Sequence, residues 1–171
     1  MAKRKNQGTA TLETIKRKAF FRVNIQEADG TISGDSGWVP NYVTNTGLAN
    51  YFIYTMMGVA NSRQMAYIAL GTGGVPASTD TSLAGELMAS TKRVAITTNT
   101  GFTNRAASNS SCTLAMYATF TASFCSVSSN ISNVGIFASS AENSLMCGAT
   151  YASSQLNTNQ AVNVSYQLSL G

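Results

Sequence analysis

Residues 162–170, Val-Asn-Val-Ser-Tyr-Gln-Leu-Ser-Leu, decide the fold class, because apolar and polar side chains alternate along them without interruption. Successive side chains of a β-strand point to opposite faces, so this period of two predicts a half-buried strand. Residues 112–124 (CTLAMYATFTASF) repeat the pattern, with Met116 and Phe120 on one face and Thr119 on the other. The C-terminal half of the chain is therefore expected to be β.

Shorter segments follow the same rule. Strands are expected at residues 21–26, 65–70, 93–98, 133–137 and 145–151. Clusters of Gly, Asn and Ser separate these segments, and such residues form turns. Several short strands with turns between them predict a mainly β fold, an antiparallel β-sandwich or a jelly-roll-like domain.

One helix is expected to interrupt the strands, over about residues 45–58, with Thr44 or Asn45 as its N-cap. The apolar positions follow helical spacing and predict the stripe that packs on the sheet: Leu48, Tyr51, Phe52, Thr55, Met56 and Val59. A shorter helical turn is expected over 80–88, with Asp80 as its cap. The fold prediction is thus a sandwich with one packed α-helix.

Positive charge is concentrated at the N-terminus. Residues 1–22 contain seven basic residues against Glu13 alone, whereas the rest of the chain has four basic residues against six acidic ones. We expect residues 1–19 to be a flexible basic arm and residues 20–171 to be a single β-sandwich domain. The predicted docking residues are Lys3, Arg4, Lys5, Lys16, Arg17, Lys18 and Arg22. They would contact an acidic surface of a neighbouring subunit, or bind nucleic acid without sequence preference.

The body of the chain has few charges. Charged residues make up 11% of the sequence, under half of the roughly 25% usual for soluble domains. Ser, Thr, Asn and Ala must therefore cover much of the surface. Such a surface can be buried against a neighbour without desolvating many charges, so we interpret it as an assembly surface and expect a homo-oligomer. A monomer with a neutral polar coat is the alternative.

Residues for catalysis are scarce. The chain has no histidine, which removes the most common general base and most zinc sites. The glycine-rich residues 71–76 follow a predicted strand, but they lack the Lys and Ser or Thr of a phosphate-binding loop. The cysteines show no metal-ligand spacing: Cys112, Cys125 and Cys147. We predict that the chain is not an enzyme and expect no catalytic residues, cofactor or metal.

Residues 67–86 (YIALGTGGVPASTDTSLAGE) resemble a pattern found in virion proteins of tailed bacteriophages. In that pattern a strand ends in a Gly-Thr-Gly turn, and a loop of small residues leads to Asp-Thr-x-Leu and a Glu. A helix like residues 43–58 precedes the turn, and a closing strand like 162–170 ends the chain. The resemblance covers about residues 38–170. The chain departs from the pattern at Val134, where an acidic residue is expected, and in its basic arm.

The resemblance implies a structural subunit of a bacteriophage virion that assembles by protein–protein contacts. A detached basic arm suits anchoring to an acidic shell, so we expect a capsid-associated role, as a decoration or minor capsid protein. A tail or fibre component is one alternative, and a small self-assembling coat protein whose arm binds packaged nucleic acid is another. No signal peptide or bilayer-spanning segment is recognisable. We expect synthesis in the host cytoplasm, localisation in the virion, other virion proteins as partners and no membrane contact.

Overall fold

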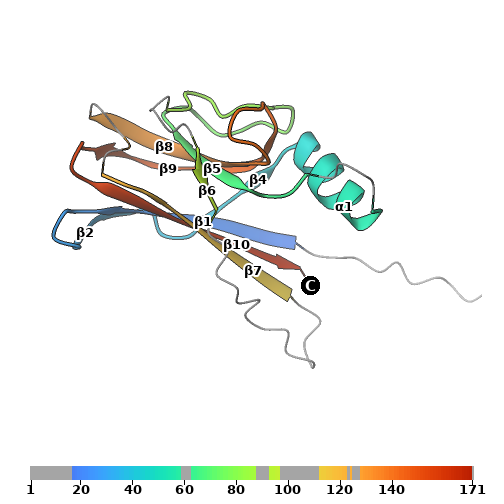
Figure 1. Cartoon of the computed structure of the whole chain (residues 1–171), viewed down its shortest axis with the longest axis horizontal. Helices are drawn as coiled ribbons and strands as arrows, with labels where there is room; N and C mark the ends of the chain where they lie inside the picture. Colours follow the sequence, from blue (N-terminus) through green and yellow to red (C-terminus); the bar gives the residue numbers. More distant parts are fainter. Residues whose placement is uncertain are drawn as a thin grey trace, which may run out of the picture.

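The computed structural model describes residues 17–58, 63–87, 93–96, 112–122, 124 and 128–170. Within these ranges the chain forms two antiparallel β-sheets that face each other, with one helix at an end of the sandwich (Figure 1). The predicted fold class, a mainly β sandwich with one helix, is confirmed.

The first sheet is built around the two longest stretches of alternating residues. Its strand order is β2-β1-β10-β7, and β3 also pairs with β1. The strands are β1 (Arg17–Gln26), β2 (Ile32–Asp35), β3 (Val39–Pro40), β7 (Cys112–Phe120) and β10 (Ala161–Leu170). β1 and β10 are paired along their full length, from Arg17 opposite Leu170 to Gln26 opposite Ala161.

The second sheet has the strand order β4-β9-β8-β5-β6. Its strands are β4 (Tyr42–Val43), β5 (Tyr67–Gly71), β6 (Val94–Ala95), β8 (Ser129–Phe137) and β9 (Leu145–Leu156). One side of this sheet faces the first sheet. On the other side a small cluster forms around Leu83, which belongs to the loop that follows β5. This loop covers the outer face, so every residue of β8 from 133 to 137 is buried.

The main core lies between the sheets, and the register of the strands explains its composition. Phe21 of β1 is opposite Tyr166 of β10, which is opposite Met116 of β7. All three side chains are buried, and the Phe21 and Tyr166 ring centroids are 4.8 Å apart. Burial of side chains of this size contributes about 1.5–3 kcal/mol each. The same face carries the other predicted core residues of these strands: Val23, Ile25, Ala118, Phe120, Val162, Val164 and Leu168.

The helix is present but differs from the prediction. It runs over residues 45–56, and its larger part is a π-helix, η1 (Gly47–Ile53), followed by α1 (Tyr54–Met56). Thr44 caps its start, because Thr44 Oγ1 accepts a hydrogen bond of 2.9 Å from the Gly47 N–H. Wider i→i+5 hydrogen bonding departs from the 3.6-residue spacing of the prediction. The end of the helix projects beyond the sheets (Figure 1). Met56 is exposed instead of facing the sheet.

Two local predictions are wrong. The strand expected to reach Phe124 ends at Phe120, and a turn follows in which the Phe124 N–H donates to the Thr121 carbonyl. The Phe124 side chain still packs edge-on against Phe120. The helical turn expected over 80–88 is absent from its described part, 80–87, which consists of turns and bends. Asp80 caps a turn, since its carboxylate accepts the N–H of Ala77.

The boundary between arm and body also differs from the prediction. β1 begins at Arg17, so residues 17–19 belong to the sheet and not to a flexible arm. Residues 1–16 lie outside the described residues. The predicted strand over 93–98 is represented by β6, Val94–Ala95, and residues 97 and 98 also lie outside.

Candidate partner-docking surface

Three of the seven basic residues predicted for docking are described, and all three lie on β1: Arg17, Lys18 and Arg22. The other four lie outside the described residues: Lys3, Arg4, Lys5 and Lys16. Arg17 and Lys18 are exposed and form no ion pair with another described residue. The start of β1 therefore presents two positive charges that no acid of the described residues compensates.

Arg22, by contrast, is engaged within the chain. Its guanidinium contacts both carboxylate oxygens of Asp35, with Nε 3.0 Å from Oδ1. The hydrogen bond from Arg22 is the main reason why the pKa of the Asp35 carboxyl lies below its ordinary value, and the Gly37 N–H adds to the effect. Arg22 thus closes the hairpin of β1 and β2, and the structure separates it from the other two basic residues.

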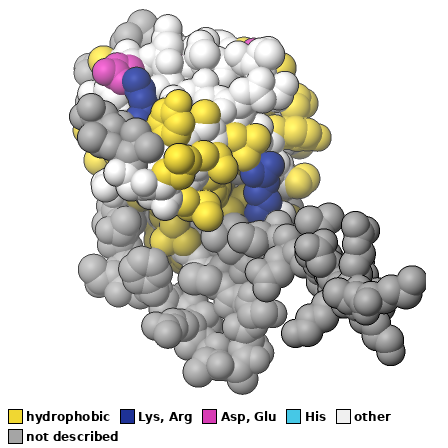
Figure 2. All heavy atoms as spheres, turned by 90° about the vertical axis from the view of Figure 1, so that its right-hand side faces the viewer, with side chains coloured by type: hydrophobic (Ala, Val, Ile, Leu, Met, Phe, Trp, Pro, Cys, Tyr) yellow, Lys and Arg dark blue, Asp and Glu magenta, His cyan; other side chains and the backbone are white. Residues whose placement is uncertain are grey.

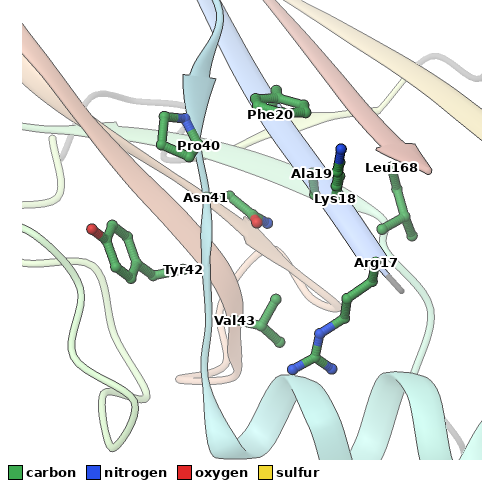
Figure 3. A pocket seen from close by; sticks show the side chains of 9 residues that line it. All are labelled: Arg17, Lys18, Ala19, Phe20, Pro40, Asn41, Tyr42, Val43 and Leu168. Atoms are coloured by element: carbon green, nitrogen blue, oxygen red, sulfur yellow. The ribbon is translucent and has the colours of Figure 1, made fainter. Parts of the chain in front are cut away.

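A groove of about 360 Å³ opens beside Arg17 and Lys18 (Figure 3). β3 pairs with β1 only at Phe20 and Phe21, and after Pro40 the chain leaves the first sheet to join the second as β4. The groove lies between the start of β1 and this crossing segment. Its lining consists of Arg17, Lys18, Ala19, Phe20, Pro40, Asn41, Tyr42, Val43 and Leu168.

The groove leads to neutral groups in the core. Asn41 Nδ2 lies 3.4 Å from the Tyr166 hydroxyl, which lies 3.9 Å from the Cys147 sulfur. Burial raises the pKa of the Cys147 thiol to about 12 and raises the pKa of Tyr166 well above its ordinary value. A thiol with so high a pKa is not an activated nucleophile. The groove is therefore lined by two cationic side chains and otherwise by neutral ones, an arrangement suited to binding.

The carboxylates in the described ranges do not converge on a common site. Asp35, Glu86 and Glu142 each contact a different arginine. Asp29 accepts hydrogen bonds from the N–H and hydroxyl of Thr31, which lower the pKa of its carboxyl. Among the residues that the structure describes, no three His, Cys, Asp or Glu side chains are grouped as metal ligands. Each of these acids has a structural partner.

The glycine-rich segment after β5 is held by backbone and side-chain contacts. Asn133 of β8 donates from Nδ2 to the Gly74 and Ala84 carbonyls, at 3.3 and 3.0 Å. The Gly73 N–H bonds to the Ala84 carbonyl, and a Cβ added at Gly73 would lie 2.4 Å from that oxygen. Glycine at position 73 thus permits close contact between the two sides of the loop, which is a structural role.

Sequence reasoning missed two buried polar residues and one surface. Arg93 and Asn133 fix loops to the second sheet, but neither has a motif that would identify it. The apolar end of the helix was also missed, because the helical spacing predicted that Met56 would be buried. The positive charge of residues 1–22 is the sequence feature that lies nearest to this surface, since Arg17 and Lys18 line the groove.

Comparisons with protein-family models, with curated protein sequences and with solved structures found no match to this chain. In the described ranges, no helix has the length and apolar character needed to cross a membrane.

Proposed function

We propose that the chain is a structural subunit of a tailed-bacteriophage virion, associated with the capsid as a decoration or minor capsid protein. The observation that carries the proposal is the resemblance of residues 38–170, and above all of 67–86, to virion proteins of these phages. In this chain the resembling loop has a defined structural role, since it covers the outer face of the second sheet and places Leu83 against Phe137 and Leu145.

The outer face of β7 and β10 supports an assembly role, because it is polar but uncharged. Hydroxyl and amide groups pair across these strands: the Thr113 and Ser169 hydroxyls are 2.9 Å apart, and the Thr119 hydroxyl donates to Asn163 at 2.8 Å. Tyr117 is exposed among them. A neighbouring subunit could cover this face without desolvating a charge, and tyrosine is enriched at protein interfaces.

The direct test is mass spectrometry of density-gradient-purified particles of the phage that carries this gene, with immunogold labelling to locate the chain. The proposal predicts peptides of the chain in purified particles and gold on the head. Absence from the particles would refute the proposal, and gold on the tail or fibres would favour the tail alternative.

The role of the arm is tested by deleting residues 2–16, because β1 begins at Arg17 and stays complete. We expect the truncated body to keep its circular dichroism spectrum and to lose binding to particles. A full-length variant with its four basic arm residues changed to Gln separates charge from length: Lys3, Arg4, Lys5 and Lys16. Full occupancy of particles by the truncated chain would contradict a docking arm.

The coat-protein alternative makes a different prediction for the protein expressed alone. Light scattering and ultraviolet absorbance after gel filtration would then detect large particles that carry nucleic acid, through counterion release by the basic arm. An accessory subunit would instead elute as a small species free of nucleic acid.

A further inference from the structure

The end of the sandwich next to the helix exposes a group of large apolar side chains. Met56 and Met57 are 74% and 71% exposed, and Ile53 and Tyr54 are 49% and 43% exposed. Figure 2 shows apolar side chains gathered on this end of the molecule. Contiguous exposed apolar groups of this kind mark interaction sites more often than chance, and methionine is common at adaptable binding surfaces.

A second hollow lies on the side of the helix that faces β7. Its volume is about 470 Å³, and it is lined by Tyr51, Thr55, Arg63, Gln64, Met65, Leu114 and Met116. Leu114 of β7 lies opposite Leu168 of β10, and Leu168 lies opposite Ala19 of β1. Because Ala19 and Leu168 line the groove of Figure 3, the two hollows lie along one row of inward-facing residues. Together with the exposed helix end, we call them the helix-end surface.

Among the residues that the structure describes, those with charge that line the two hollows are all positive. Arg17 and Lys18 line the first hollow and Arg63 lines the second, and no described Asp or Glu lines either one. In Figure 3 the Arg17 side chain extends toward the helix. Arg63 is paired with Glu142, but both side chains are substantially exposed, and exposed ion pairs are weak enough to exchange partners. The helix-end surface is therefore apolar with a cationic border.

The positive charges of this surface favour some binding partners over others. A second copy in isologous contact would place Arg17 and Lys18 of one subunit near the same residues of the other, which is repulsive. An anionic bilayer would satisfy the charges but would present a flat surface to two separate hollows. Hollows of this kind are filled by individual apolar side chains, which act as anchors at protein interfaces.

We infer that the helix-end surface binds an apolar, acidic segment of another protein of the particle, with apolar side chains in the two hollows and carboxylates next to Arg17, Lys18 and Arg63. The placement of this partner in a virion rests on the proposed function, whereas the chemistry of the surface does not.

The inference is tested with synthetic peptides titrated into the full-length protein by isothermal titration calorimetry. The probe is a peptide of about 16 residues with Leu at helical i, i+3, i+4 and i+7 positions and Glu elsewhere. One control peptide has Lys in place of every Glu, and another has Ser in place of every Leu. We expect the acidic apolar peptide to bind at least about tenfold more tightly than either control, and more weakly in about 0.5 M NaCl.

Variants locate the binding on this surface. M56S/M57S should weaken binding of the acidic peptide by about tenfold or more, and R17E should remove the preference for Glu over Lys peptides. Met56, Met57 and Arg17 are exposed, so these changes should preserve the fold. Ile32→Ser is the matched control, because Ile32 is also an exposed apolar residue but lies on β2, at the opposite end of the sandwich (Figure 1).

Several results would overturn the inference. These are equal binding of all three peptides, binding of none, tighter binding to phosphatidylglycerol vesicles than to the acidic peptide, and a dimer that M56S/M57S dissociates. The peptide test requires no particle, so the two proposals fail separately. A chain that binds the peptide but is absent from virions would refute only the proposed function, whereas a virion chain that does not bind it would refute only this inference.

Discussion

Arg93 is expected to be the most important single ion-pairing residue for the stability of the described fold. Its side chain is only 3% exposed, and its guanidinium contacts both carboxylate oxygens of Glu86, at 2.8 and 3.0 Å. Arg93 Nη1 also donates to the Ser139 and Glu142 carbonyls, at 2.8 and 2.7 Å. The guanidinium carbon lies 3.5 Å from the centroid of the Phe137 ring. Arg93 thereby connects the loop after β5, the β8–β9 turn and the second sheet.

Replacing Arg93 by Met keeps an extended side chain over Phe137 and removes every hydrogen bond. Glu86 then becomes an unpaired carboxylate in a site where its side chain is only 12% exposed. Removing one partner of a buried pair destabilises proteins by about 3–5 kcal/mol, since the remaining charge stays desolvated. Total stabilities are typically about 5–15 kcal/mol, so against a mid-range value of about 10 kcal/mol we expect the free energy of unfolding to fall by about a third to a half. At about 2–4 °C per kcal/mol, Tm should fall by roughly 10 °C.

Urea denaturation followed by far-ultraviolet circular dichroism measures this change. Arg22→Met is the matched control, because Arg22 also contacts both oxygens of an acid, Asp35, but at the surface. The free energy of unfolding of this control should fall by only about 0.2–1 kcal/mol. The double variant Glu86→Gln/Arg93→Met should be more stable than Arg93→Met, because it has no unpaired carboxylate. A loss below about 1 kcal/mol for Arg93→Met, or equal losses at both arginines, would refute the argument from burial.

Three further predictions concern the loop, the thiol and the strand register. Gly73→Ala should destabilise the fold by about 1–3 kcal/mol in urea denaturation, because its Cβ would overlap the loop backbone, whereas Gly74→Ala, with no atom within 4 Å of its Cβ, should be neutral. The pKa of Cys147 is about 12 in the folded chain and near 9 when unfolded, so above pH 9 the unfolded state loses the proton first and stability falls. Between pH 9 and 11, the free energy of unfolding of the wild type should fall relative to that of Cys147→Ala by about 1.4 kcal/mol per pH unit. Denaturation at each pH measures this difference, and parallel pH profiles for the two proteins would contradict the burial of the thiol. Val164→Asp should abolish folding, as judged by circular dichroism, whereas Ser165→Asp, on the opposite face of β10, should fold. The reverse result would mean that the buried and exposed faces of β10 are exchanged.

The strands that the sequence predicted best are those with one face in the core and one in solvent. β10 alternates from Ala161 to Ser169 and β1 from Phe21 to Gln26, because their outer faces there meet no other layer among the described residues. β8 was predicted only at 133–137 but begins at Ser129, and its alternation is lost where the Leu83 loop covers its outer side. Periodicity is an accurate guide only where a sheet has a single buried face.

Short elements escaped prediction for a related reason. β2, β3 and β4 have two to four residues each, too few for a period of two to emerge. They exist because longer strands provide backbone partners: β1 pairs with β2 and β3, and β9 pairs with β4. The groove beside Arg17 arises where β3 ends and the chain crosses to β4, so its position depends on tertiary contacts that no local pattern encodes.

The basic residues of the described body that have no acidic partner lie at one end of the sandwich, which makes that end the docking candidate. Of its five basic residues, Arg22, Arg63 and Arg93 are each paired with an acid, and only Arg17 and Lys18 are not. These two lie beside the helix-end surface and are continuous in sequence with the remaining basic residues of the N-terminus. Positive potential and exposed apolar area therefore coincide at one end.

Electrostatic attraction should accelerate the encounter with an acidic partner and weaken with added salt, while the apolar hollows should control dissociation. Charge variants at Arg17 should thus act mainly on the association rate, and variants at Met56 and Met57 mainly on the dissociation rate.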